Sequence, residues 1–228
     1  MKQSGLRIGL MVPVNNTTME SELLAWLPES STCRTLRIAR GKGTLTPVDL
    51  PAYVAQAMTM AKAFAGESVD LVVYGCTAAG FMAGPSRDAE IAAELAAVTG
   101  KPVVTTASAM IAALRHLGTR NIALISPYLD HVNERLQAFL EQSGIGVEIL
   151  ASFHAQSTDE LATITPAQIA ALARATMRAS CDGLFIACSQ LPTREILGDL
   201  EREFGRPVWS SIRATAWEAC RADATIEG

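Results

Sequence analysis

The chain has 228 residues, of which 49% are hydrophobic and 18% are charged, and its formal net charge is −4. This length suits one large domain or two small ones, and the apolar share is enough for a sizeable core, which excludes a disordered chain. The sequence has no basic stripe, so nucleic acid is not an expected partner. The N-terminal apolar run is too short for a signal peptide and no run is long enough to span a membrane, so we expect a cytoplasmic protein that does not bind membranes.

Apolar runs alternate with amphipathic stretches along the whole chain, and this βαβα rhythm predicts parallel sheets covered by helices. The expected strands are Leu6–Val12, Thr35–Ala39, Leu71–Tyr74, Val103–Thr105, Ile122–Ile125, Val147–Leu150, Leu184–Ala187 and Val208–Ser210. The expected helices are Pro51–Ala65, Arg87–Thr99, Ala107–His116, Asp130–Ser143, Pro166–Ser180, Thr193–Phe204 and Arg213–Ala222. Pro166 suits a first helical turn, and Gly118 and Gly144 suit helix ends.

The two halves of the chain follow the same pattern, which is clearest where "TGKPVVTT" at 99–106 matches "FGRPVWSS" at 204–211. Such an internal repeat predicts an α/β protein of two pseudo-symmetric, Rossmann-like half-domains, each with a four-stranded parallel sheet flanked by helices. The expected first half-domain spans residues 1–106, joined by the C-terminal helix 212–228, and the second spans 107–211.

Two cysteines end equivalent strands, Cys76 in "VVYGCTAAG" and Cys188 in "GLFIACSQLP". Ligands bind beyond the carboxyl ends of parallel strands, so two facing half-domains would bring both thiols to one cleft. There, the amide groups that follow each cysteine favour a thiolate and can hold a carboxylate. The alternative is that these cysteines are small packing residues, as we expect for Cys33, Cys181 and Cys220.

The number and spacing of the cysteines also limit which other kinds of site the chain can form. Five cysteines at irregular spacings argue against a disulfide framework. CxxC and HExxH motifs are absent and there are three histidines, so we expect no metal site.

Polar side chains follow two further strands at the same predicted edge. In "VPVNNTTMESE", at 12–22, Asn16 or Thr17 can cap the following helix, with Glu20 completing a capping box, or can donate to a ligand. In "SPYLDHVNERL", at 126–136, Tyr128 can donate to a carboxylate or an enolate, or can simply be an amphipathic residue at a helix start. We expect the loops 40–50 and 154–166 to lie over the cleft.

The stretches "VPVNNTTME", "YGCTAAGF", "SPYLDHVNERL" and "ACSQLPT", in that order, resemble the aspartate/glutamate racemase superfamily. Within it they look most like the maleate cis–trans isomerase and arylmalonate decarboxylase branch. The resemblance implies a homo-oligomer without a cofactor, with the site between the half-domains. It also implies that Cys76 adds to a double bond and that Cys188 is the acid and base. The residues that it assigns to binding a small carboxylate substrate are Pro13, Asn16, Thr77, Ala78, Tyr128 and Ser189.

Two departures from that branch leave the substrate open. Glu160 stands where maleate isomerases carry a carboxylate-binding asparagine, and the "GKGTLTP" loop resembles the decarboxylases. Arylmalonate decarboxylases, however, have glycine at the position of Cys76. Our first hypothesis is therefore a cis–trans isomerase of maleate or a related unsaturated dicarboxylate. The alternatives are an amino-acid or hydantoin-type racemase that uses two cysteines for proton transfer, an arylmalonate-type decarboxylase, and a ligand-binding regulator without turnover.

Overall fold

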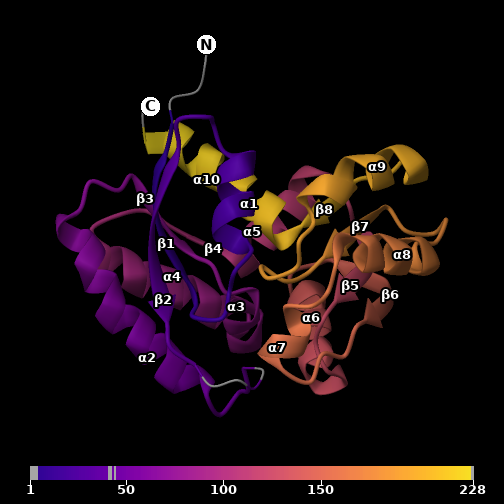
Figure 1. Ribbon diagram of the computed structural model, residues 1–228, viewed down its shortest axis with the longest axis horizontal. Helices are drawn as coiled ribbons and strands as arrows, with labels where there is room; N and C mark the ends of the chain where they lie inside the picture. Colours follow the sequence, from indigo (N-terminus) through magenta and orange to yellow (C-terminus); the bar gives the residue numbers. More distant parts are fainter. Residues whose placement is uncertain (1–4, 41–42, 44, 227–228) are drawn as a thin grey trace.

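The computed structural model describes residues 5–40, 43 and 45–226. Part of the expected loop 40–50, namely residues 41–42 and 44, therefore lies outside the described residues. The chain folds into two four-stranded parallel sheets flanked by helices, as the repeat predicted (Figure 1).

The two sheets have the same strand order. The first sheet has the order β2-β1-β3-β4 and the second has the order β6-β5-β7-β8. The strands of the first are β1 (Arg7–Pro13), β2 (Thr32–Ile38), β3 (Leu71–Tyr74) and β4 (Val103–Thr105). Those of the second are β5 (Asn121–Ser126), β6 (Gly146–Ser152), β7 (Gly183–Ile186) and β8 (Val208–Ser210). Because β3 and β7 hold equivalent places, Cys76 and Cys188 each follow an equivalent strand by two residues.

The helices cover both faces of the sheets. Their bounds are α1 (Met19–Trp26), α2 (Leu50–Ala61), α3 (Thr77–Ala83), α4 (Pro85–Thr99), α5 (Thr106–His116), α6 (Asp130–Gln142), α7 (Thr158–Leu161), α8 (Pro166–Thr176), α9 (Arg194–Phe204) and α10 (Ser211–Ile226). A 3-10 turn, η1 (Lys62–Gly66), extends α2. Among the described residues, no helix is both long and apolar enough to cross a membrane.

Helix α10 packs beside α1 and α5 and contacts β3 and β4 of the first sheet (Figure 1). Helix α5, which the expected boundary places in the second half-domain, packs against α3 and α4. These two helices belong to the expected first half-domain. The expected boundaries of the two half-domains, after residue 106 and after residue 211, stay predictions.

Helix ends follow local chemistry where the sequence carries a strong signal. Gly118 and Gly144 have positive φ and close the ends of α5 and α6, as expected. Thr165 and Gln168 form a capping box at the start of α8, which begins at Pro166. The end of α8 was predicted four residues too late, because the Arg178 side chain binds the carbonyl oxygens of residues 175–177 and ends the helix there.

Candidate active site

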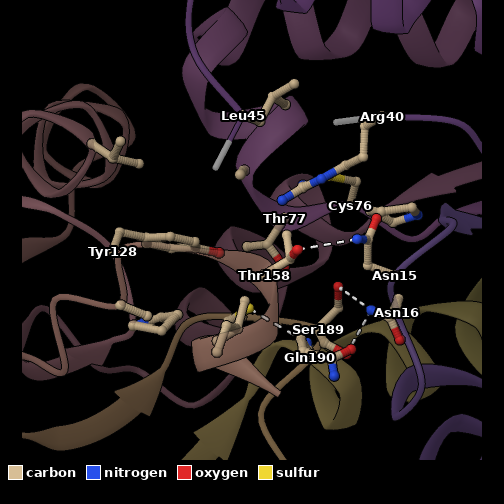
Figure 2. Close-up of a pocket in the computed structure, with 17 residues that line it drawn as sticks. Asn15, Asn16, Arg40, Leu45, Cys76, Thr77, Tyr128, Thr158, Ser189 and Gln190 are labelled. Carbon is tan, nitrogen blue, oxygen red and sulfur yellow. Dashed lines mark hydrogen bonds between the residues drawn. The ribbon is translucent and has the colours of Figure 1, made fainter. Parts of the chain in front are cut away.

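Cys76 and Cys188 line one cavity between the two half-domains (Figure 2). They are 4% and 5% exposed, and the cavity has a volume of about 50 Å³, which is room for several waters. Every residue that the sequence and the resemblance assigned to the site lines it. The full lining is Pro13, Asn15, Asn16, Arg40, Leu45, Cys76, Thr77, Ala78, Pro127, Tyr128, Val132, Ala155, Thr158, Leu161, Cys188, Ser189 and Gln190.

Cys76 is the N-cap residue of α3, and the amides of Ala78 and Ala79 lie near its sulfur without forming a capping hydrogen bond. The Arg40 guanidinium and these amides lower the pKa of the thiol, but burial outweighs them and the pKa is raised overall. The expected support for a thiolate is therefore present, but in the empty cavity it is weaker than desolvation. The Tyr53 hydroxyl also lies near this sulfur, but it makes no hydrogen bond with it and acts as a nearby dipole only.

Cys188 has a similar setting with less positive charge. The amide of Gln190 lies 3.4 Å from its sulfur, and the Tyr128 hydroxyl lies beside it. Burial raises the pKa of this thiol, and charge on Cys76 raises it further. Among the groups that lower the pKa of each thiol, Arg40 has the strongest effect on Cys76 and the weakest effect on Cys188. The surroundings thus favour ionisation of Cys76 over ionisation of Cys188.

Tyr128 is positioned by an edge-to-face contact with Phe81, with ring centroids 5.4 Å apart and an interplanar angle of 63°. Burial raises the pKa of its phenol well above the ordinary value. Tyr128 is therefore a neutral hydrogen-bond donor in the cavity, which is the form that can stabilise a carboxylate or an enolate.

Asn16 binds both half-domains. Its Oδ1 accepts hydrogen bonds from the amides of Thr18 and Met19 at 3.1 and 2.9 Å, and its Nδ2 donates to the carbonyl oxygen of Ser189 at 3.1 Å. Asn16 thus accepts a hydrogen bond from the amide of the first residue of α1, although the N-cap residue itself is Thr18, whose side chain makes no capping bond. The expected capping box is wrong, because Glu20 instead forms an ion pair with Arg37 at 3.4 Å.

A set of hydrogen bonds across the half-domain boundary, which we call the polar seam, escaped the sequence analysis. It consists of Asn16–Ser189, Thr17–Gln190 and Glu22–Thr193. Two bonds join Thr17 to Gln190, at 2.9 and 3.0 Å. The signal for it was available, since "NNTTMESE" and "CSQLPT" are polar stretches that follow strands expected to end at the same cleft.

Arg40, Leu45 and Leu161 are further lining residues that sequence reasoning missed. Arg40 follows β2, and its Nη2 donates to the carbonyl oxygen of Gly43 at 3.2 Å. The two leucines belong to the expected loops 40–50 and 154–166, so both loops do supply cavity residues. The signal for Arg40 was its place directly after the expected strand Thr35–Ala39, at the carboxyl edge of the sheet.

Glu160 does not line the cavity. Its side chain is exposed, and its Oε2 accepts a hydrogen bond of 2.7 Å from the amide of Gln156. The neighbouring residues Thr158 and Leu161 face the cavity instead. The acidic side chain therefore places no negative charge beside a bound ligand.

The five cysteines are free thiols. Within the described residues, no cluster of three or more His, Cys, Asp or Glu side chains that could hold a metal ion is found. Two thiols of different ionisation tendency, one cation and one neutral phenol are together able to add a nucleophile and transfer a proton to an acid substrate.

The comparisons with known proteins match this geometry. A family model described as arylmalonate decarboxylase matches residues 8–226. The chain is 30% identical over 224 residues to the maleate isomerase of Nocardia farcinica, covering 95% of this chain and 89% of that protein. It is 30% identical over 183 residues to the arylmalonate decarboxylase of Bordetella bronchiseptica, covering 79% and 76%.

A solved structure of the Nocardia farcinica maleate cis–trans isomerase, a mutant with a covalently bound succinylcysteine intermediate, has a TM-score of 0.88 to this chain. It is 28% identical, and the match covers 96% of this chain and 92% of that one. The chain is therefore an enzyme of the arylmalonate decarboxylase and maleate isomerase family, within the aspartate/glutamate racemase superfamily.

Proposed function

We propose that the protein is a cofactor-independent cis–trans isomerase of maleate or a related unsaturated dicarboxylate. The observation that carries this proposal is the pair of buried thiols in one cavity, with Cys76 in the more positive surroundings. An isomerase that works by addition and elimination needs one nucleophile and one proton donor on adjacent carbons, and two thiols supply both.

The reaction balances with these groups alone. The Cys76 thiolate adds to one alkene carbon, and the electron pair of the double bond moves to the other carbon, where its carboxylate holds it as an enediolate. Cys188 gives its proton to that carbon, and the bond between the two carbons is now single and rotates. The Cys188 thiolate then removes the proton, the C–S bond breaks, and the trans alkene leaves with Cys76 restored as thiolate.

Binding of the substrate carboxylates is assigned to the remaining site residues. The neutral Tyr128 hydroxyl and the amides around Thr77, Ala78 and Ser189 are donors at the two strand ends, beside Pro13 and Asn16. Charge that develops in the enediolate needs such preorganised donors. The succinylcysteine found in the Nocardia farcinica isomerase mutant is the kind of adduct this mechanism forms.

An arylmalonate-type decarboxylase is the second candidate. It is favoured by the family model and by the apolar wall that Leu45, Val132 and Leu161 form in the cavity. One solved structure of arylmalonate decarboxylase, however, gains a cysteine by a glycine-to-cysteine mutation, whereas both cavity thiols of this chain are native. The homo-oligomeric state and the cytoplasmic location stay predictions.

The test is proton NMR of the protein with maleate in deuterated buffer. A falling maleate signal with a rising fumarate singlet supports the isomerase, and Cys76→Ala and Cys188→Ala should each abolish it. Cys33→Ala is the matched control, because Cys33 is a thiol outside the cavity. Unchanged maleate, with CO₂ release from an arylmalonate, would establish the decarboxylase, and α-deuterium labelling of an amino acid would establish the racemase.

A further inference from the structure

Arg40 is the one side chain with a permanent charge among the described residues that line the cavity. Its guanidinium reaches from the end of β2 toward Cys76 (Figure 2). A fixed cation in a small, largely buried cavity attracts anions strongly, because little water is present to screen it.

Arg40 differs from the arginines that precede it on β2. Arg34 pairs with Glu67 at 3.2 Å and Arg37 pairs with Glu20 at 3.4 Å. Arg40 has no carboxylate partner in the described part of the chain, and its buried Nε has no hydrogen-bond partner there. A buried donor without a partner is costly, so this group is suited to a ligand oxygen that the protein itself does not provide.

Several other donors of the cavity are already engaged. The amide of Gln190 is bonded to the Cys188 sulfur at 3.4 Å, which leaves the amides around Ala78 and the Tyr128 hydroxyl for one carboxylate. The carboxamide of Asn16 is bonded within the polar seam. A substrate with two carboxylates therefore needs a further donor, and the Nε of Arg40 is such a group.

We propose that Arg40 binds one carboxylate of the substrate and makes this site selective for dicarboxylates over monocarboxylates. This inference rests on the proposed function, since it specifies how the same cavity recognises its substrate. A guanidinium is well matched to the task, because it can bind both oxygens of a carboxylate at once.

A purely structural role for Arg40 makes a different prediction. Its bond to the Gly43 carbonyl could serve only to hold the loop after β2 in place. Loss of Arg40 would then weaken the binding of every ligand by the same factor, whatever the ligand's charge.

The first test measures thiol alkylation and needs no turnover. The rates at which iodoacetate and iodoacetamide modify Cys76 are compared by peptide mass spectrometry. The two reagents share a leaving group and differ in charge, so their rate ratio reports the local cation and cancels changes in thiolate fraction. We expect Arg40→Met to lower the iodoacetate/iodoacetamide ratio by about tenfold, the effect of losing one charge-assisted contact.

The second readout is protection of Cys76 by ligands. Succinate protection should weaken by about tenfold in Arg40→Met. Butyrate protection should change by less than about twofold, because its single carboxylate can bind the donors at the strand ends, whereas iodoacetate must hold its carboxylate beside Cys76 for its methylene carbon to reach the sulfur. Arg40→Lys should retain part of the succinate preference, and Arg34→Met should behave as wild type because Arg34 lies outside the cavity. Should Arg40→Met fail to fold, Arg40→Gln gives the same comparison.

An unchanged reagent ratio, or equal weakening of succinate and butyrate, overturns the proposal. Its failure is separable from failure of the proposed function. If wild type leaves maleate untouched but prefers succinate through Arg40, the isomerase is wrong and the carboxylate site stands. If Arg40→Met isomerises maleate as well as wild type does, the isomerase stands and the carboxylate site at Arg40 is wrong.

Discussion

The hydroxyl of Ser189, next to Cys188, donates a hydrogen bond of 2.9 Å to the carbonyl oxygen of Gly75, next to Cys76. The bond joins the two strand ends that carry the thiols. The approach is close on the Gly75 side, where a Cβ atom would lie 2.6 Å from the Met19 sulfur. The relative position of the two thiols is therefore fixed by residues adjacent to them in sequence.

Ser189→Ala should reduce both stability and activity. It leaves the Gly75 carbonyl oxygen without this buried donor and removes one acceptor of Asn16, which we expect to lower the free energy of unfolding by about 1–3 kcal/mol. Urea unfolding measures this change. Ser180→Ala is the control, because its hydroxyl bonds to Glu148 at an exposed site, and an equal loss in both variants would contradict the prediction.

Cys188→Ala should trap an adduct. Without the Cys188 thiol the enediolate takes its proton from water, and no base is in place to remove that proton again, so the thioether on Cys76 should accumulate with maleate. Intact-protein mass spectrometry should show one added maleate in Cys188→Ala and none in Cys76→Ala. Adduct formation on a residue other than Cys76 would be inconsistent with the assigned roles.

The pH dependence of kcat/KM should be bell-shaped with its maximum on the alkaline side. Burial raises the pKa of Cys76, so the fraction of thiolate falls by about tenfold per pH unit below that pKa. Cys188 must keep its proton, and its own raised pKa keeps the alkaline limb at high pH. Arg40→Met should move the acid limb to higher pH, since Arg40 lowers the pKa of Cys76. A flat profile through the neutral range would rule out Cys76 as the group that must ionise.

Asp88 should make stability fall as pH rises through the weakly acidic range. It is 1% exposed, and burial raises the pKa of its carboxyl from 3.8 to about 6. The protonated form is favoured by folding, so its contribution is complete below the ordinary pKa and is lost as pH rises through about 6. Between pH 5 and pH 7.5 the wild type should lose about 1 kcal/mol more unfolding free energy than Asp88→Asn. Parallel curves for the two proteins in chemical denaturation would show that Asp88 does not titrate in this range.

Glu160→Gln should leave KM for maleate within about twofold of wild type. The side chain is exposed and bonds to the Gln156 amide, so its charge is screened from the cavity. Gln keeps an acceptor oxygen for that bond, which makes it a conservative replacement. Steady-state kinetics decide the matter, and a large fall in KM would mean that Glu160 turns toward the ligand.

The positions of the thiols could be predicted from the sequence because they depend on short-range patterns. Apolar runs located β3 and β7, the repeat showed that they are equivalent, and parallel topology placed Cys76 and Cys188 at one edge. Tyr128 and Asn16 followed by the same reasoning, since each stands just after a strand that ends at that edge.

The rest of the site depends on contacts that no local pattern encodes. Whether Glu160 or Leu161 faces the cavity is decided by the single turn α7. The pairing of Thr17 with Gln190 joins residues from different half-domains. The position of the Arg40 side chain near Cys76 depends on the direction in which the chain leaves β2. Helices α3 and α7, of seven and four residues, are too short to show helical periodicity.

The polar seam has a consequence for how ligands reach the thiols. Its hydrogen bonds join the segment after β1 and helix α1 to the segment that carries Cys188, so a hinge motion that parted the half-domains would break them. The outer wall, formed by Leu45 and Leu161, takes no part in those bonds. We therefore expect substrate and product to exchange past this wall, while the distance between the two sulfur atoms stays constant through the catalytic cycle.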